Sequence, residues 1–429
     1  MRPLKENLYR AALWSMSAAN LPRLTANRYS GIGAILSLHR VHQVESELHF
    51  GTRHLSITPE NFRRMIMGLV ERGYDFVTMS EVERRLHGDA PSTRKFVCLT
   101  FDDGFEDTYS QAFQICRWLR IPMVVYVATG ALKRSFPMMW GIGLERLVLK
   151  NKEIQFRWNG TTQFLPAASV ADKRRAFFLM VERFAAARPE EIRKASEEMR
   201  VRYGISFMEL TEQHAITPAM VREMHASGLV EFGAHGISHV NLRLLDAAEA
   251  RHEIAESRRD LEQVVGEEIC HFSYPYGKAD AAGPREYAMC RQLGLRTAVT
   301  SQMGNIVPAD RARPHALPRL TLSGGYQDTS LLDLLLSGTL PRLATVLRKM
   351  TSARANLVHA LISARRLPLP SFNGSRDALP DELADHVARF EEFVRPLRGD
   401  HRSDIAVLLN QQIGGAPDIH VRGHESILA

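Results

Sequence analysis

The sequence predicts an α/β protein built on a parallel sheet that is either open or closed into a barrel. Short apolar segments alternate with helical patterns in two stretches, one before residue 130 and one after residue 217. Such alternation is typical of parallel strands joined by crossover helices. The composition, 45% hydrophobic and 24% charged, is ordinary for a soluble globular protein. No stretch reaches the ~18 consecutive apolar residues of a membrane-spanning helix.

The first stretch contains strands and helices that begin and end at recognisable signals. Thr58 and Pro59 open a helix whose apolar stripe ends at Gly73. Ser80 and Glu83 have the spacing of a capping box for the next helix. The other predicted elements are a strand over Asp75–Met79, a strand over Lys95–Phe101, a helix over Gln111–Leu119 and a strand over Met123–Ala128.

The second stretch repeats the pattern after an interruption. It is predicted to contain helices at 217–228, 247–265 and 284–293, and strands at 229–234, 270–274, 297–300 and 319–322. Residues 131–216 differ, because Trp158-Asn159-Gly160 indicates a hairpin turn and 169–203 is helical with a break near Pro189. We predict that 131–216 is an insertion that caps the functional site.

Three short motifs each follow a predicted strand, where parallel α/β proteins carry their functional residues. The first, Thr100-Phe101-Asp102-Asp103-Gly104, provides one carboxylate for a metal and one for a proton, or else is an ordinary Asp-Gly turn. In the second, His235 and His239 share one face if the backbone makes a helical turn, a spacing common among zinc ligands. The third, Phe272-Ser273-Tyr274-Pro275-Tyr276-Gly277, forms a rigid aromatic wall or a packed aromatic turn.

Taken together and in this order, the motifs resemble those of the polysaccharide deacetylase family, the NodB-homology or carbohydrate esterase 4 group. Residues 100–104 match its first motif at every position. Gly236 replaces the usual Ser or Thr of the second motif, and Ser273 stands where many members carry Arg. The resemblance covers roughly residues 30–325 and implies a deformed (β/α) barrel of about seven parallel strands.

The resemblance also implies a role for each motif residue. Asp103, His235 and His239 would bind a divalent metal, zinc foremost, leaving room for water and substrate. Asp102 would be the general base. The backbone N–H of Tyr276 would stabilise the oxyanion. The implied reaction is metal-dependent removal of N-acetyl groups from an N-acetylated glycan or lipid-linked glycan.

The general acid is assigned through a branch of the family that takes it from an N-terminal strand. The Leu-x-His motif of many members is absent, whereas 34–41 resembles that branch's first strand and ends near His39. We therefore predict His39 as the acid, with His42 as the second choice and a surface histidine pair as the alternative. Arg319, in a Leu-Pro-Arg element, would orient Asp102 or bind an acidic sugar.

Two other functions fit the same motifs. A non-catalytic carbohydrate-binding or assembly protein could share the fold, but it would need no base and metal ligands together. An O-acetyl esterase or cyclic amide hydrolase would keep the chemistry and change the substrate. Trp140, Trp158 and Phe164 of the insertion either stack on sugar rings or pack it on the barrel.

The predicted organisation is an N-terminal helical segment (1–30), the barrel with its insertion (31–330) and a helical basic extension (331–429). Residues 334–376 contain no Asp or Glu and seven Lys or Arg, which equals the net charge of +7. The extension either contacts an anionic membrane or packs on the barrel; the charge does not require nucleic acid.

The N-terminus is predicted to be an amphipathic helix rather than a cleaved signal. Four scattered cysteines favour a reducing location, cytoplasmic or at the inner face of the membrane. The substrate implied by the family belongs to the cell envelope.

Overall fold

The computed structural model describes residues 21–43, 55–89, 92–158, 160–322 and 330–340. Predictions for residues 1–20 and 341–429, including the first amphipathic helix and most of the basic extension, lie outside these described residues. Within them, no helix is both long and apolar enough to cross a bilayer.

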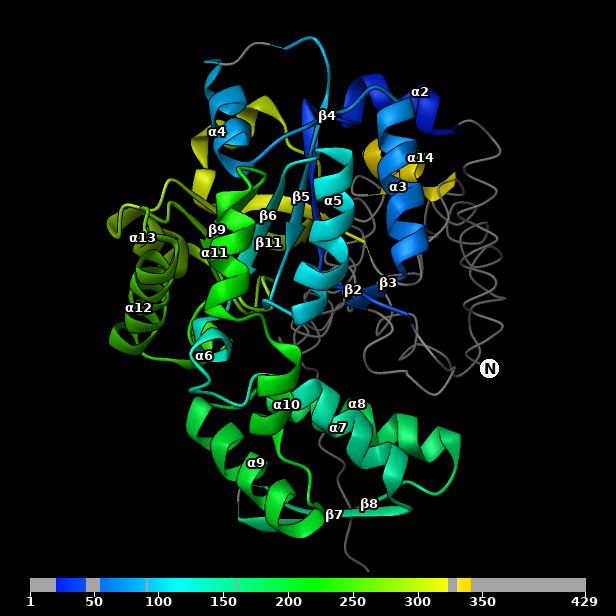
Figure 1. The fold of residues 1–429 in the computed structure, drawn as a ribbon, viewed down its shortest axis with the longest axis vertical. Coiled ribbons are helices and arrows are strands. Elements are labelled where there is room, and N and C mark those ends of the chain that lie inside the picture. Colours follow the sequence, from blue (N-terminus) through cyan, green and yellow to red (C-terminus); the bar gives the residue numbers. More distant parts are fainter. Residues whose placement is uncertain (1–20, 44–54, 90–91, 159, 323–329, 341–429) are drawn as a thin grey trace, which may run out of the picture. The chain divides into compact units, whose positions relative to one another are not determined.

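Seven parallel strands close into a barrel, which confirms the predicted fold class (Figure 1). The ring closes because β1 pairs with β5 along its whole length, from Gly33 opposite Phe96 to Leu38 opposite Phe101. In order around the ring the strands are β1 (Gly33–Leu38), β12 (Leu317–Thr321), β11 (Thr297–Met303), β10 (His271–Ser273), β9 (Val230–Ala234), β6 (Met123–Val127) and β5 (Phe96–Phe101).

Alternate strand residues face the barrel interior and the surrounding helices. On β5, Cys98 belongs to the apolar cluster inside the barrel, whereas Val97 and Leu99 belong to the cluster under the outer helices. Because side chains alternate along a strand, Thr100 and Asp102 continue the inward series of Phe96 and Cys98. The direction of the Asp102 side chain in the first motif therefore follows from the strand β5 that precedes it.

The amino end of the barrel is closed by α4 (Met79–His87), whose Val82 and Leu86 pack in the interior cluster (Figure 1). The predicted capping box at Ser80 and Glu83 is wrong. Thr78 caps this helix by accepting a hydrogen bond from the Glu81 N–H, while the Ser80 hydroxyl donates to Glu231 instead. The preceding strand, β4 (Asp75–Phe76), is accordingly shorter than predicted.

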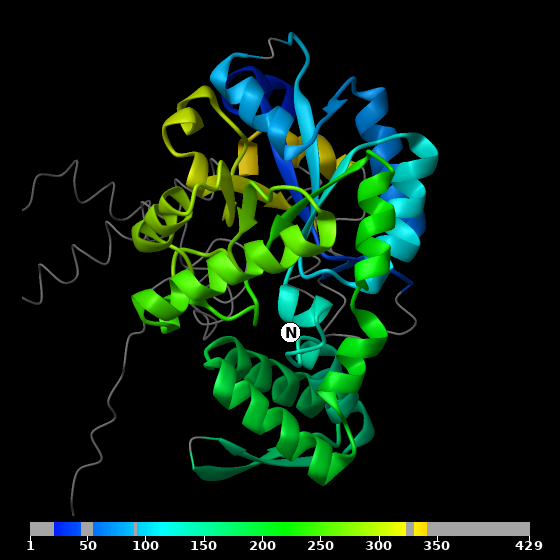
Figure 2. The same ribbon diagram turned by 60° about the vertical axis from the view of Figure 1, so that its left-hand side comes forward.

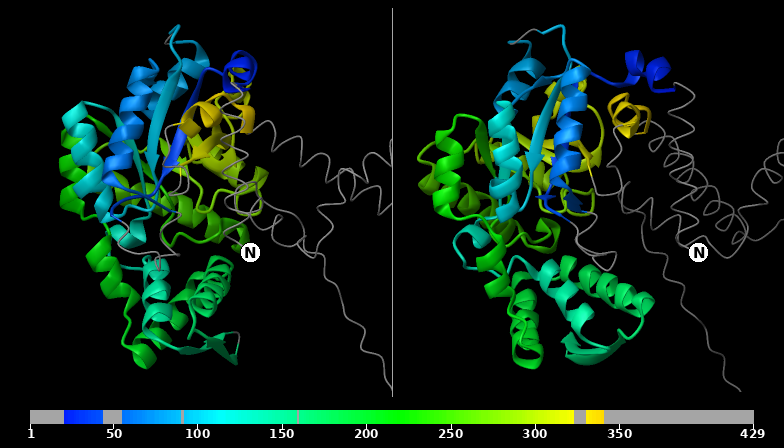
Figure 3. Two further views of the ribbon diagram at one scale, coloured as in Figure 1. Left: turned by 90° about the vertical axis from the view of Figure 1, so that its right-hand side faces the viewer. Right: turned by 45° about the vertical axis from the view of Figure 1, so that its right-hand side comes forward.

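Helices pack around the outside of the barrel (Figures 1 and 3). The predicted helix at 111–119 is a π-helical turn, η2 (Thr108–Phe113), followed by α5 (Gln114–Leu119). The other outer elements are α3 (Pro59–Glu71), α6 (Thr129–Leu132), α11 (Pro218–Ala226), α12 (Ala247–Val265), α13 (Pro284–Gln292) and the short turns η3 (Leu242–Leu244), η4 (Pro308–Ala312) and η5 (Pro314–Ala316). A small two-stranded sheet, β2 (Arg40–Val41) and β3 (Ser56–Ile57), continues from β1.

The insertion forms a layer of helices with its own apolar core (Figure 2). Its hairpin and its break at Pro189, which is the first residue of α9, are confirmed. It contains α7 (Trp140–Lys150), β7 (Glu153–Trp158), β8 (Thr161–Pro166), α8 (Val170–Ala185), α9 (Pro189–Tyr203) and α10 (Phe207–His214). Arg188 joins it to the barrel by donating to the Leu244 carbonyl and pairing with Glu249.

The two ends of the described barrel region lie together. Asn305 donates hydrogen bonds to the carbonyls of Ser30, after α2 (Leu21–Tyr29), and of Leu336, in α14 (Ser330–Leu336). Arg72 of α3 forms a two-fold ion pair with Asp333 of α14, at 2.6 and 2.8 Å. These contacts join the first and last described helices to the barrel.

Candidate metal centre

Asp103, His235 and His239 converge at the carboxyl end of the barrel, as the motifs predict. The Asp103 Oδ1 atom lies 3.4 Å from Nε2 of His235 and 3.2 Å from Nε2 of His239. One ligand atom from each residue lies within 4.8 Å of the others, and no other such group of three occurs among the described residues. A His₂Asp set is a donor combination that a divalent cation such as zinc accepts.

The loop between the two histidines is not the helical turn that the sequence suggested. Residues 235–240 form neither helix nor strand, with bends only at Ile237 and Ser238, and Gly236 has a φ of 74°. The imidazoles nevertheless approach each other, with ring centroids 4.9 Å apart at 63°. The backbone therefore brings the ligands together by a left-handed kink rather than by helical periodicity.

Left-handed backbone conformations concentrate at this centre. Among the described residues, five other than glycine have a positive φ, and three of them are Asp103 (75°), His239 (50°) and Tyr276 (61°). Each such residue costs on the order of 1–3 kcal/mol and persists only where its surroundings hold it in place. At Asp103 the kink breaks the strand alternation, so that Asp102 faces the interior while Asp103 faces the histidines.

The surroundings of the three residues fit a divalent cation. The Nδ1 atom of His235 lies 2.7 Å from the Ser273 carbonyl, which fixes a proton on Nδ1 and leaves Nε2 with a lone pair. The Oδ1 atom of Asp103 is buried and has no hydrogen bond of acceptable geometry from any described residue. Burial by itself would raise the pKa of Asp103, but the two histidines hold it well below its usual range. An anionic buried oxygen without a hydrogen bond, facing two imidazoles, is typical of a metal ligand.

Asp102 is held by a buried arginine. The Arg319 guanidinium donates to Oδ1 at 2.8 Å and to Oδ2 at 2.6 Å, and it also donates to Ser273 Oγ at 3.1 Å. Burial would raise the pKa of Asp102, but the Arg319 charge outweighs it, together with His235, and lowers the pKa below its ordinary value. Asp102 is thus an oriented, ionised carboxylate beside the candidate metal ligands.

His39 and His42 follow β1 at the same end of the barrel. The His39 imidazole is half-buried and lies within electrostatic range of both aspartates; burial lowers its pKa, and Asp103 and Asp102 act against that effect. The His42 ring instead lies 2.8 Å from Ser56 Oγ, on the β2–β3 sheet. A polar cavity of about 470 Å³ beside this sheet includes His42 and His214 in its wall.

Tyr276 lies against the second histidine ligand, with ring centroids of Tyr276 and His239 4.9 Å apart. The Tyr276 carbonyl accepts a hydrogen bond from Ser301 Oγ at 2.6 Å. In the part of the chain that the structure describes, no group accepts a hydrogen bond from the Tyr276 N–H. This N–H is therefore available to a ligand.

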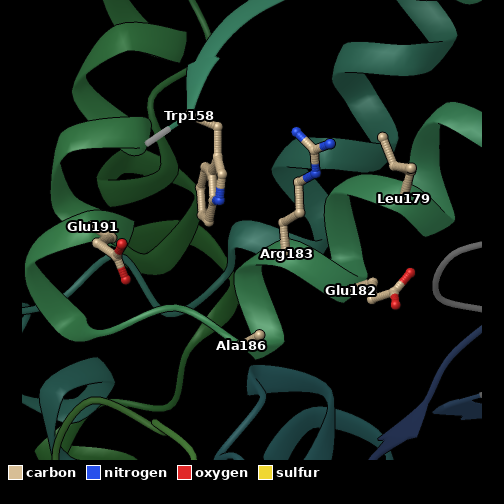
Figure 4. A pocket seen from close by; sticks show the side chains of 6 residues that line it. All are labelled: Trp158, Leu179, Glu182, Arg183, Ala186 and Glu191. Atoms are coloured by element: carbon tan, nitrogen blue, oxygen red, sulfur yellow. The ribbon is translucent and has the colours of Figure 1, made fainter. Parts of the chain in front are cut away.

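The insertion contains a second cavity, of about 450 Å³, lined by Trp158, Arg183 and neighbouring residues (Figure 4). Trp140 and Trp158 both pack on Phe184, at 5.4 and 5.5 Å between ring centroids. Phe164, in contrast, is 60% exposed. Packing within the insertion accounts for Trp140, while Trp158 and Phe164 keep surface that a sugar could contact.

Two residues at the centre had no predicted role. Ser273, noted in the sequence only as a departure from the family motif, contacts both His235 and Arg319. Glu253 of α12 hydrogen-bonds to the histidine loop. A carboxylate on the apolar face of a helix was the available signal, because Glu253 lies between the buried Ala250 and Ser257.

Comparison with known proteins gives one family model, described as polysaccharide deacetylase, which matches residues 157–298. The matched residues include both histidines and Tyr276. An 83-residue stretch is 32% identical to the poly-beta-1,6-N-acetyl-D-glucosamine N-deacetylase of Escherichia coli strain K12, covering 19% of this chain and only 12% of that protein.

Two similar solved structures come from other bacteria. The Streptococcus pyogenes deacetylase PplD in complex with acetate is 18% identical, with a TM-score of 0.48, over 71% of this chain and 97% of that one. IcaB from Ammonifex degensii is 20% identical, with a TM-score of 0.44, over 72% and 97% respectively.

Proposed function

Since the chain belongs to the polysaccharide deacetylase family, we propose that it is a metal-dependent hydrolase that removes N-acetyl groups from an N-acetylated glycan. The observation that supports this most is the convergence of Asp103, His235 and His239 beside an Asp102 carboxylate held by Arg319. A binding protein would gain nothing from an ionised buried carboxylate next to a set of metal ligands.

Asp103, His235 and His239 would hold the metal, with zinc as the foremost candidate among divalent cations. A divalent cation held there supplies Lewis acidity, which polarises the acetamide carbonyl and lowers the pKa of water. The hydrogen bond from the His235 Nδ1–H to the Ser273 carbonyl would leave the lone pair of Nε2 for the cation.

The remaining steps belong to side chains and backbone of the same centre. Asp102 accepts a proton from water as the water oxygen bonds to the carbonyl carbon. The Tyr276 N–H donates to the oxygen that becomes negative. When the C–N bond breaks, the protonated His39 imidazole donates its proton to the leaving nitrogen, so that the products are acetate and a free amine.

The proposed substrate class is a glycan that contains N-acetylated hexosamine. The support is the name of the Escherichia coli relative, which acts on a polymer of N-acetyl-D-glucosamine, and the exposed aromatic surface of Phe164 in the insertion. Membrane contact through the basic residues 342–376, and a cytoplasmic or inner-membrane location, stay predictions. Liposome binding by chains with and without residues 331–429 would test the membrane contact.

The test is acetate release by the purified full-length chain, with metal content measured in parallel. We expect acetate and free amine in equal amounts from N-acetylated oligosaccharides or lipid-linked glycans, loss of activity after chelation, and recovery when zinc is restored. Acetate from O-acetylated substrates alone would make the protein an esterase. A metal-loaded chain that releases acetate from no member of the panel would contradict the proposal.

A further inference from the structure

The loop between His235 and His239 carries two of the three candidate metal ligands, yet it has no helix or strand to hold it. Its backbone N–H and C=O groups must therefore find partners elsewhere in the fold. The partners come from two helices, and they hold the loop from opposite sides.

Glu253 of α12 holds the N–H side of the loop. One carboxylate oxygen accepts hydrogen bonds from the Ile237 N–H at 2.7 Å and the Ser238 N–H at 3.0 Å. The other accepts from the Ser238 hydroxyl at 2.6 Å. The Glu253 side chain is itself buried, at 8% exposure. Hydrogen bonds to an ionised acceptor are the strong ones, about 1.5–3 kcal/mol each.

The amino end of α6 holds the C=O side of the same loop. The Thr129 N–H donates to the Gly236 carbonyl at 3.0 Å, and the Gly130 N–H donates to the Ile237 carbonyl at 2.8 Å. The approach is close, because a Cβ atom at Gly130 would lie 2.4 Å from the Ile237 oxygen.

The contacts from Glu253 and those from α6 both depend on one helix, α12. Asp260, two turns along α12 from Glu253, accepts hydrogen bonds from the Thr129 hydroxyl at 3.1 Å and from Lys133 Nζ at 2.8 Å. The position of α12 thus sets the position of the loop from both sides. This arrangement explains how left-handed conformations at Gly236 and His239 are maintained.

We propose that Glu253 is a positioning residue for the metal centre, which fixes the loop so that the Nε2 atoms of His235 and His239 meet Asp103. The inference rests on the metal site of the proposed function, but not on the reaction or its substrate. Glu253 contacts neither metal ligand side chain by a hydrogen bond in the described structure. Its effect therefore passes through the loop backbone.

The first test is the affinity for Zn²⁺ and Co²⁺, measured by competition with a chromophoric chelator in the full-length chain. Glu253→Gln keeps the shape of the side chain but removes its charge, and we expect a loss of about 10–100-fold in affinity, with a changed visible spectrum of the Co²⁺ protein. Glu256→Gln is the matched control, because Glu256 lies on the same helix and pairs with Arg259 at 2.6 Å. Wild-type affinity and spectrum in Glu253→Gln would overturn the proposal.

The second test needs no metal. In the metal-free protein, Glu253→Gln should speed amide hydrogen exchange in peptides covering 236–239 more than in the strands of the barrel, under conditions in which the variant remains folded. Ser238→Ala, which removes one of the three hydrogen bonds, should give a smaller change in the same direction. If Glu253→Gln does not fold, Ser238→Ala decides the matter, and unchanged exchange and metal affinity in it would overturn the proposal.

The outcomes separate this inference from the proposed function. Metal loss in Glu253→Gln together with a wild type that releases no acetate would keep the positioning role and reject the deacetylase. If the wild type releases acetate and Glu253→Gln binds metal as tightly as wild type, the deacetylase is kept and the positioning role is rejected. A wild type that binds no divalent metal would reject both.

Discussion

Strands β9 and β10 have a histidine–carboxylate cluster at each of their ends, and the two clusters are built in opposite ways. At the carboxyl end, His235 follows β9 and Ser273 ends β10. At the amino end, Glu231 lies near the start of β9 and His271 begins β10. The same strands therefore contribute to both clusters, although the carboxylate of the carboxyl-end cluster, Asp103, follows β5.

The amino-end cluster is fully paired. Glu231 accepts hydrogen bonds from the N–H groups of Met79 and Ser80 at 2.6 and 3.1 Å and lies 3.4 Å from His271 Nε2. The other ring nitrogen of His271 lies 2.8 Å from Thr297 Oγ1. Since Met79 and Ser80 begin α4, the carboxylate also meets the positive end of the helix dipole. This cluster joins α4 to the barrel.

The carboxyl-end cluster is incompletely paired and strained. Asp103 Oδ1 has no hydrogen bond from a described residue, and Asp103 and His239 both have a positive φ. Barrel enzymes keep their chemistry at this end, whereas the other end serves stability. The comparison teaches that an unsatisfied, strained cluster, rather than the presence of histidine and carboxylate as such, distinguishes the functional end.

Asp103→Ala should give the largest effect. Loss of the anionic ligand should abolish tight metal binding and lower acetate release on the order of a thousandfold or more. The metal-free protein should still fold, because Asp103 Oδ1 accepts no hydrogen bond of good geometry from a described residue and only its attraction to the two histidines is lost. Metal analysis, acetate release and urea unfolding measure the three quantities. A variant that retains metal and turnover would remove Asp103 from the centre.

Asp102→Asn should lower kcat by about 10²–10⁴-fold while metal content stays at the wild-type level. Asparagine keeps a hydrogen-bond acceptor for Arg319 but cannot take a proton at neutral pH. Metal analysis beside steady-state kinetics separates the two effects. If metal were lost in proportion to activity, Asp102 would be a ligand or a support for one.

His39→Gln should lower kcat for the N-acetylated substrate by about 10²-fold. It should affect an aryl acetate much less, because a phenolate leaves without a proton. His42→Gln is the control variant, because the His42 ring lies within hydrogen-bond distance of Ser56 Oγ. A loss confined to His42→Gln would move the acid there, and equal losses on both substrates would argue against any proton donor at position 39.

The sequence predicted the carboxyl end far better than the amino end. Asp103, His235 and His239 each follow an apolar strand, and the rule that strand ends meet at one edge of a parallel sheet was enough to bring them together. The contact between Arg319 and Asp102 was one of two suggested roles; its function is still a prediction. The left-handed kink between His235 and His239 could not be predicted from the sequence, because the i, i+4 spacing suggested a helical turn.

Glu231, His271 and Glu253 were missed for a common reason. Glu231 and His271 are polar residues inside short buried strands, and Glu253 lies on the buried face of a largely polar helix. The partner of each belongs to another element of the fold: Glu231 meets Ser80, 151 residues earlier. A buried polar residue signals that a partner exists, but only the fold identifies it. The assignment of Ser80 as a helix cap failed for this reason, because its hydroxyl is used by Glu231.

Glu231→Gln should destabilise the protein by about 1.5–3 kcal/mol, the range for hydrogen bonds to a charged group. Metal content and kcat per folded molecule should stay unchanged, because this cluster lies at the opposite ends of β9 and β10. Urea unfolding of the metal-free protein, with metal analysis on the same preparation, measures both. Lost metal binding at full stability would contradict the division between the two ends.

The smallest expected effect is a change in the acid sensitivity of folding. Burial acts to raise the pKa of Glu231, but the hydrogen bonds and charge of His271 and the Ser80 groups outweigh it and lower the pKa from 4.5 to about 2. A carboxyl whose pKa is lower in the folded state stabilises the fold fully above pH 4.5 and loses that contribution as the pH falls towards 2. At about 1.4 kcal/mol per pKa unit, the contribution is at most about 3.5 kcal/mol, and only part of it is lost by pH 3. The free energy of unfolding, measured with urea between pH 6 and pH 3, should therefore fall more steeply for wild type than for Glu231→Gln, whose side chain cannot titrate. Parallel curves for the two proteins would show that the amino-end cluster does not stabilise the fold through its charge.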